Sequence, residues 1–267
     1  MTRTLKPRRI LITNDDGIEA PGIKLLERVA RRFASEVWVV APLHEQSGKA
    51  HGMTIHTGLK VEARGARHYA VSGTPTDCVF VAINKVLKER PPELVLSGIN
   101  VGENVGEDLT YSGTVAAAIE ATLLGFPAIA LSQMTKIGHP PRWDTAEHWA
   151  PLVLERLLAA GWPGGVLINV NFPDRAPYEV PGIIAAPQGR HAILDVLEER
   201  VDEDGVVLVR RPVADGLYLK RFEQAKTPGT DLDVIVNQGA VAVTPIQLDL
   251  THRDTLHHLR ETLALKT

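Results

Sequence analysis

The chain has 267 residues, with 29 Lys and Arg against 32 Asp and Glu, which gives a formal net charge of −3. This balance offers no general attraction to a nucleic-acid backbone, so a nucleic-acid polymer is not expected as a partner. The single cysteine, Cys78, excludes an intrachain disulfide, and no apolar run approaches the roughly 18 to 20 residues that span a bilayer, so we expect a soluble, cytoplasmic protein without a membrane partner.

The first half of the chain alternates short β-rich apolar runs with apolar residues at helical spacing. Strands are predicted at residues 9–13, 36–41, 93–96, 127–131 and 166–170. Helices are predicted at residues 23–33, 75–87, 114–124 and 143–160. Pro75 suits the first turn of its helix. This alternation indicates an α/β fold with a doubly wound, mostly parallel, Rossmann-like sheet covered by helices on both faces.

The pattern changes after about Pro173 to short segments broken by Pro, Gly and charged residues. The predictions here are hairpins at 180–186 and 206–211, a returning strand at 241–244, and a terminal helix at 250–265 capped by Thr251 or Asp254. We therefore expect a Rossmann-like core at residues 1–175. The hairpin-rich extension at 176–267 is not expected to be an independent domain.

Two adjacent carboxylates, Asp15 and Asp16, follow the first predicted strand, and Gly17 allows a sharp turn after them. Ligands of a parallel α/β sheet bind at the carboxyl ends of its strands. Carboxylates packed together there repel each other, and a bound divalent cation such as Mg²⁺ relieves that repulsion. The alternative is an Asp-Asp-Gly turn in which one acid caps the next helix.

Two polar segments follow other predicted strands. The loop after residues 36–41 contains His44, a candidate acid or base, and Ser47, whose hydroxyl suits a metal or a phosphate. The glycine-rich run at 97–106 contains Asn100 and Asn104, whose amides can ligate a metal or donate to phosphate oxygens. This run is neither a P-loop nor a dinucleotide-binding turn. The alternatives are a solvated serine and a glycine-rich surface loop.

Ser112, Gly113 and Thr114 stand at the start of an apolar predicted helix. Exposed N–H groups at a helix start attract anions, and two hydroxyls add donors, so these residues are a candidate phosphate seat. Ser112 or Thr114 can also be an ordinary N-cap, and the two roles are compatible. All four polar segments fall at one edge of the predicted sheet. A cation surrounded by donors for a phosphate indicates phosphoryl hydrolysis.

These four segments, in this order, resemble the SurE family, the survival-protein-E nucleotidases, whose signatures are an Asn-Asp-Asp-Gly strand end and a Ser-Gly-Ile-Asn loop. Residues 73–79, 169–173 and 243–245 are also similar to landmarks of that family. The resemblance is weakest at 192–226, where residues 210–218 lack a tryptophan that many members have.

The resemblance implies a metal-dependent phosphatase that acts on nucleoside 5′- and 3′-monophosphates, and in some members on polyphosphate. It also implies one divalent cation per subunit, Mg²⁺ or Mn²⁺, and a homodimer or homotetramer with exchanged C-terminal segments. The metal ligands that it implies are Asp15, Asp16, Ser47 and Asn100.

The expected mechanism uses Asp15 or Asp16 as a metal ligand and general base for water that attacks the phosphate in line. The residues expected to bind phosphate oxygens are Asn104, Ser112, Gly113 and Thr114. His44 is a candidate for proton transfer to the leaving group. One rival is an aspartyl-phosphate phosphatase, which needs two acids two residues apart rather than adjacent. The other rival is a non-catalytic nucleotide-binding regulatory module.

Overall fold

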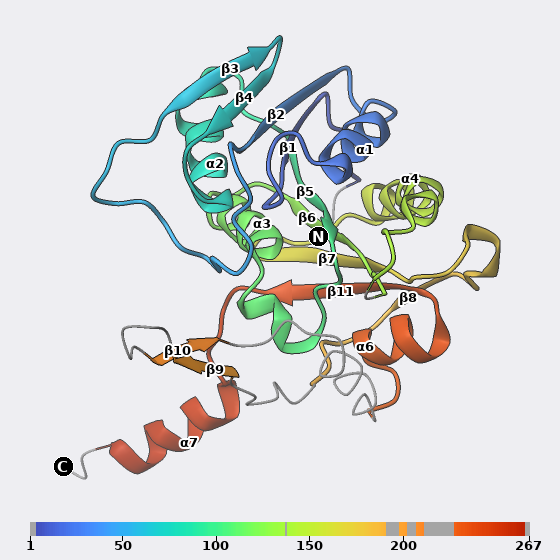
Figure 1. The fold of residues 1–267 in the computed structure, drawn as a ribbon. Helices are drawn as coiled ribbons and strands as arrows, with labels where there is room; N and C mark the ends of the chain where they lie inside the picture. Colours follow the sequence, from blue (N-terminus) through green and yellow to red (C-terminus); the bar gives the residue numbers. More distant parts are fainter. Residues whose placement is uncertain (1–3, 137, 191–197, 202–206, 211–226, 265–267) are drawn as a thin grey trace.

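A nine-stranded sheet forms the centre of the computed structural model, which describes residues 4–136, 138–190, 198–201, 207–210 and 227–264. Its strand order is β3-β4-β2-β1-β5-β6-β7-β11-β8 (Figure 1). The strands are β1 Arg9–Thr13, β2 Glu36–Pro42, β3 Val61–Gly65, β4 His68–Val71, β5 Leu94–Val101, β6 Ala128–Gln133, β7 Val166–Phe172, β8 Ile183–Ala185 and β11 Val241–Gln247. Only the β3–β4 and β7–β11 pairs within this sheet are antiparallel, so the predicted fold class is confirmed.

Helices cover both faces of the sheet. Those that pack on it are α1 Pro21–Ala30, α2 Pro75–Val81 with its continuation Ala82–Val86, α3 Gly113–Leu123 and α4 Trp143–Ala160. Helices α1 and α4 pack with Ile10 and Ile12 on one face, and α2 and α3 pack with Leu11 on the other. Because successive strand side chains point to opposite faces, a strand covered on both sides must be apolar throughout, and β1 meets that requirement.

Three elements differ from the sequence predictions. Strand β5 continues to Val101 instead of ending at residue 96, so Asn100 lies within the strand, beyond an irregularity in its pairing with β6. The β3–β4 hairpin was not predicted, because β3 is mostly exposed and carries no buried apolar run. Residues 180–186 do not form a hairpin: β8 pairs parallel with β11, a partner almost 60 residues away that local sequence cannot indicate.

The C-terminal part agrees more closely with expectation. Strands β9 Glu198–Val201 and β10 Val207–Arg210 pair antiparallel. The first and last residues of the segment predicted at 206–211 lie outside the described residues, and so do residues 212–218. A terminal helix, α7 Arg253–Leu263, is present, but neither Thr251 nor Asp254 caps it. His252 is the cap, because its Nδ1 accepts a hydrogen bond from the Thr255 N–H at 3.2 Å. Among the described helices, none combines the length and the apolar character needed to cross a membrane.

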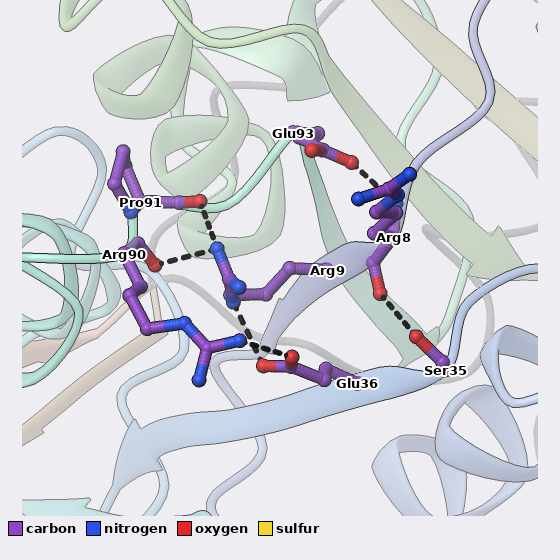
Figure 2. A network of polar contacts seen from close by, with 7 residues as sticks. All are labelled: Arg8, Arg9, Ser35, Glu36, Arg90, Pro91 and Glu93. Carbon is purple, nitrogen blue, oxygen red and sulfur yellow. Dashed lines mark hydrogen bonds and ion pairs between the residues drawn. The ribbon is translucent and has the colours of Figure 1, made fainter.

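A polar network holds the amino-terminal ends of β1, β2 and β5 together (Figure 2). The Arg9 guanidinium donates to Glu36 Oε2 at 3.0 Å and to the carbonyl oxygens of Arg90 and Pro91 at 3.0 and 2.9 Å. Arg90 donates to the other oxygen of Glu36, and Arg9 and Glu36 are mostly buried. This network lies at the sheet edge opposite to the strand ends that carry Asp15 and Asn100.

Glu36→Gln is expected to lower the midpoint of thermal unfolding at neutral pH, because it removes the charge that Arg9 and Arg90 share. The hydrogen bond from Arg9 lowers the pKa of Glu36 below its usual 4.5. Its stabilising effect is therefore complete above pH 4.5 and is lost as the pH falls through the lower folded-state value. Calorimetry at several pH values should show the two proteins converging in acid. Glu62→Gln, in the exposed Glu62–Arg64 pair, is the matched control and should change little.

Candidate functional site

Four predicted segments come together at the carboxyl edge of the central strands. Asp15 and Asp16 follow β1, Ser47 lies in the loop after β2, and Asn100 lies near the end of β5. Strands β2, β1 and β5 are adjacent and parallel, so their carboxyl ends share one edge. The amino terminus of α3 reaches the same edge, as its contact with Asp15 shows.

Asp15 is held by the start of α3. It is 4% exposed, and the Thr114 hydroxyl donates a hydrogen bond to its Oδ1. Burial raises the pKa of Asp15, and hydrogen bonds from the Thr114 side chain and backbone oppose that increase. Thr114 is itself fully buried. The Thr114 hydroxyl therefore donates to a carboxylate, whereas the sequence predicted that it would bind a phosphate.

Gly113 also packs closely against Asp15. A Cβ added at Gly113 would lie 2.8 Å from Asp15 Cβ and 2.9 Å from its Oδ2, so only glycine lets the helix approach this closely. Ser112 is the N-cap of α3, and its Oγ accepts from the Val115 N–H at 3.1 Å. The capping alternative is thus realised at Ser112.

Asp16 is half-buried and carries an oxygen without a partner. Among the described residues, no hydrogen bond reaches its Oδ2, which is shielded from solvent. Burial and then the charge of Asp15 raise the pKa of Asp16 to about 7, against a hydrogen bond from the Val101 backbone. The negative charge of Glu45, a residue that was not among the predicted site residues, also raises the pKa of both carboxylates.

Asn100 is oriented by the turn that follows β5. Its Nδ2 donates to the carbonyl oxygens of Val101 and Gly102 at 3.2 and 2.8 Å, which turns the amide oxygen the other way. Gly98, with φ of 134°, makes the preceding irregularity, and a side chain there would collide with the Leu131 carbonyl. In the Ser-Gly-Ile-Asn motif, the glycine therefore allows the irregular backbone and the asparagine supplies the polar group.

Asn104 is enclosed in a buried amide network. Its Nδ2 donates to Ser132 Oγ at 2.8 Å, and its backbone N–H donates to Asn171 Oδ1 at 2.8 Å. Its carbonyl oxygen accepts from Asn169 and Asn171. The network joins the loop that follows β5 to β6 and β7. The sequence signal for this network is a pair of asparagines at alternate positions of β7, Asn169 and Asn171, which the sequence analysis connects only with the family resemblance.

The loop after β2 presents Ser47 and His44 at the surface. Both are exposed, and Gln46 between them is tied to Asp15 by a backbone hydrogen bond of 2.8 Å from its N–H to the Asp15 carbonyl oxygen. The loop also fits closely against the turn at Gly17, whose backbone approaches that of His44 and Glu45. The hydrogen bond of Gln46 thus fixes the loop one residue before Ser47, and a contact of Ser47 with a metal stays a prediction.

The donor set fits a hard divalent cation. The partnerless Oδ2 of Asp16, the carboxylate of Asp15 and the amide oxygen of Asn100 are oxygen ligands of the kind that Mg²⁺ and Mn²⁺ prefer. Within the described part of the chain, no group of three or more His, Cys, Asp or Glu side chains is placed to hold a metal. Such a richer group would be expected for a structural zinc site.

Gly113→Ala is expected to lower the activity of this site by about tenfold or more, since a displacement of about 1 Å at a catalytic group is already costly. The added methyl group would press on Asp15, whereas alanine itself suits a helix. Gly58→Ala is the control, because a Cβ there meets open space. Equal catalytic rates in the two variants, measured beside their unfolding midpoints, would contradict the close packing of α3 on Asp15.

Comparison with known proteins gives similarity along nearly the whole chain. The family described as Survival protein SurE matches residues 10–195. A protein of Paramagnetospirillum magneticum named 5′-nucleotidase SurE is 54% identical over 251 residues, covering 94% of each chain. A protein of the same name from Parvibaculum lavamentivorans is 48% identical, covering 97% of this chain and 92% of its own. The crystal structure of the SurE protein from Aquifex aeolicus matches with a TM-score of 0.82 at 34% identity, covering 96% of this chain and 99% of that one.

Proposed function

The chain belongs to the SurE family, and we propose that it hydrolyses nucleoside 5′-monophosphates to nucleoside and phosphate with the help of a divalent cation. It is a nucleotidase and therefore a phosphoric monoester hydrolase. One observation carries the proposal to these residues. The Asp15 carboxylate, just after β1, accepts a hydrogen bond from the first turn of α3, which supports a proposed cation site next to a proposed anion site.

The proposed cation ligands are Asp15, Asp16, Ser47 and Asn100, with one cation per subunit, Mg²⁺ or Mn²⁺. When bound, this cation neutralises the two carboxylates and acts as a Lewis acid toward the phosphate. Thr114 orients Asp15, and the turn after β5 orients Asn100. Asp16 is half-buried, whereas Asp15 is buried. We therefore assign to Asp16 the role of the general base that accepts a proton from the attacking water.

The phosphate is proposed to bind against the first turn of α3, through Ser112 and Gly113. The Gly113 N–H belongs to the positive end of the helix, where an anion is favoured. The Ser112 N–H already donates to the Asp108 carbonyl oxygen at 3.0 Å, so the group proposed for Ser112 is its hydroxyl. Thr114 contributes by holding Asp15, and Asn104 contributes by holding the loop after β5 against β6 and β7 through its buried amide network. A direct phosphate contact of Asn104 or Thr114 stays a prediction. His44, exposed on the loop after β2, is proposed to protonate the leaving oxygen.

Several finer statements are proposals that follow from the family. They are activity on nucleoside 3′-monophosphates and on polyphosphate, a cytoplasmic location, and a homodimer or homotetramer with exchanged C-terminal segments. Helix α7 supports the last of these, since none of its residues is buried and Leu259 and Leu263 are exposed. The division into a core at 1–175 and an extension at 176–267 is proposed on the same basis.

The test is phosphate release from a panel of nucleoside 5′- and 3′-monophosphates, an aryl phosphate and polyphosphate, with Mg²⁺ or Mn²⁺ present. We expect the 5′-monophosphates to react fastest. Nucleotide binding without release of phosphate from any substrate would favour the regulatory-module alternative instead. Isolation of a phosphorylated enzyme during turnover would favour the aspartyl-phosphate alternative.

A further inference from the structure

The segment 43–60 carries one of the proposed metal ligands on an exposed loop. It connects β2 to β3 and makes a long excursion beside α2 and α3 (Figure 1). Asp15, Asp16 and Asn100 belong to strand ends, which the sheet itself fixes. Ser47 lies at the surface, so its distance from the other ligands depends on what fastens the loop.

Two backbone hydrogen bonds bracket Ser47. On its amino-terminal side the Gln46 N–H donates to the Asp15 carbonyl oxygen at 2.8 Å. On its carboxyl-terminal side the Ala50 N–H donates to the Tyr111 carbonyl oxygen at 3.2 Å. Residues 47–49 therefore form a short arch between the turn that holds the carboxylates and the residue that precedes the N-cap of α3.

A side-chain contact fastens the loop to α3 immediately beyond this arch. His51 Nε2 lies 3.0 Å from Glu120 Oε2, and the Glu120 side chain is only 9% exposed. A buried carboxylate needs a partner, and His51 supplies one from the loop. The pair therefore joins the Ser47 loop to the same helix whose first turn contacts Asp15.

A second side-chain contact fastens the loop to α2. Asp77, which is 1% exposed, accepts from the Thr54 N–H at 3.0 Å and from the Thr54 hydroxyl at 2.7 Å. It also accepts from the Thr74 N–H at the start of α2, and the Thr74 hydroxyl donates to the Gly52 carbonyl oxygen at 2.7 Å. Asp77 thus completes the capping box of α2 and holds Thr54 with one carboxylate, while Thr74 holds Gly52.

We propose that the His51–Glu120 and Thr54–Asp77 contacts are two anchors that position Ser47 for the divalent cation and thereby set the affinity of the site. The inference rests on the proposed function. Groups that only orient metal ligands typically change metal affinity by about 10- to 100-fold. The anchoring residues themselves are not proposed to contact the cation or the substrate. A saturating cation concentration should therefore restore the turnover of variants at the anchors to within a few-fold of that of the wild type.

The test compares Mn²⁺ binding to the metal-free protein by titration calorimetry with turnover at saturating Mn²⁺. The variants are His51→Ala and Thr54→Val, because substitution of Asp77 would also remove the cap of α2. We expect dissociation constants raised by about tenfold or more in each variant. Thr54→Ser, which keeps the hydroxyl, should bind as the wild type does. Glu36→Gln, at the opposite edge of the sheet, is the control for general destabilisation.

The outcomes separate the two proposals. If wild-type protein binds no Mn²⁺, or if Asp16→Asn binds it equally well, the proposed function fails. If wild-type binding depends on Asp16 but His51→Ala and Thr54→Val bind as tightly as the wild type, only the anchoring proposal is overturned. Equal weakening by Thr54→Ser and Thr54→Val, or by Glu36→Gln, would also overturn it, since the effect would then be unrelated to the anchors.

Discussion

Asp16→Asn should lower the rate of phosphate release by about 10²- to 10⁴-fold, the range that a positioned acid or base contributes. The substitution removes both a charged ligand and the proposed proton acceptor while keeping the size of the side chain. Initial rates at saturating Mg²⁺ or Mn²⁺ measure the effect. Asp144→Asn, the same change at an exposed position of α4, should leave the rate unchanged. A rate near that of the wild type in Asp16→Asn would remove Asp16 from the mechanism.

The same substitution should raise the thermal stability of the metal-free protein at neutral pH. Asp16 has a buried oxygen without a partner among the described residues, and it stands beside the buried carboxylate of Asp15. A neutral amide removes the repulsion between them. Loss of activity together with a higher unfolding midpoint would identify a functional group that the fold holds at a cost. Loss of both would indicate that Asp16 supports the fold instead.

Local sequence contained most of what positions this site. The apolar run of β1 and the two acids after it sufficed to predict a strand that ends just before two carboxylates, and a parallel sheet binds its ligands at that edge. Partners distant in the chain were beyond such reasoning. The parallel pairing of β8 with β11 and the extension of β5 to Val101 depend on strands that come from elsewhere in the sequence.

The roles of individual polar residues were the least predictable part. An asparagine has the same donors whether it faces a phosphate or Ser132, and only the packing of the loop after β5 against β6 decides that Asn104 faces Ser132. Likewise, Thr114 in the first turn of a helix reads as a cap or a phosphate donor, whereas the proximity of α3 to β1 directs it to Asp15. The residue types predicted the chemistry of the edge, and the tertiary contacts assigned the partners.

Removal of divalent cations should abolish phosphate release, and added Mg²⁺ or Mn²⁺ should restore it. Without a cation, the charges of Asp15 and Asp16 repel the substrate phosphate, and the pKa of Asp16, which burial and the charge of Asp15 raise to about 7, leaves part of the Asp16 population protonated at neutral pH. Phosphate release is measured after EDTA treatment, after buffer exchange, and after readdition of each metal. Full activity in EDTA-treated protein would exclude a cation from the reaction.

The same cation should also stabilise the folded chain, which gives a measurement independent of turnover. A ligand at 100 times its dissociation constant adds about 2.7 kcal/mol to the free energy of unfolding when it binds only the folded state. Wild-type protein should therefore unfold at a higher temperature as Mn²⁺ is added, and Asp16→Asn should respond much less. An equal response in the two proteins would place the cation elsewhere on the chain.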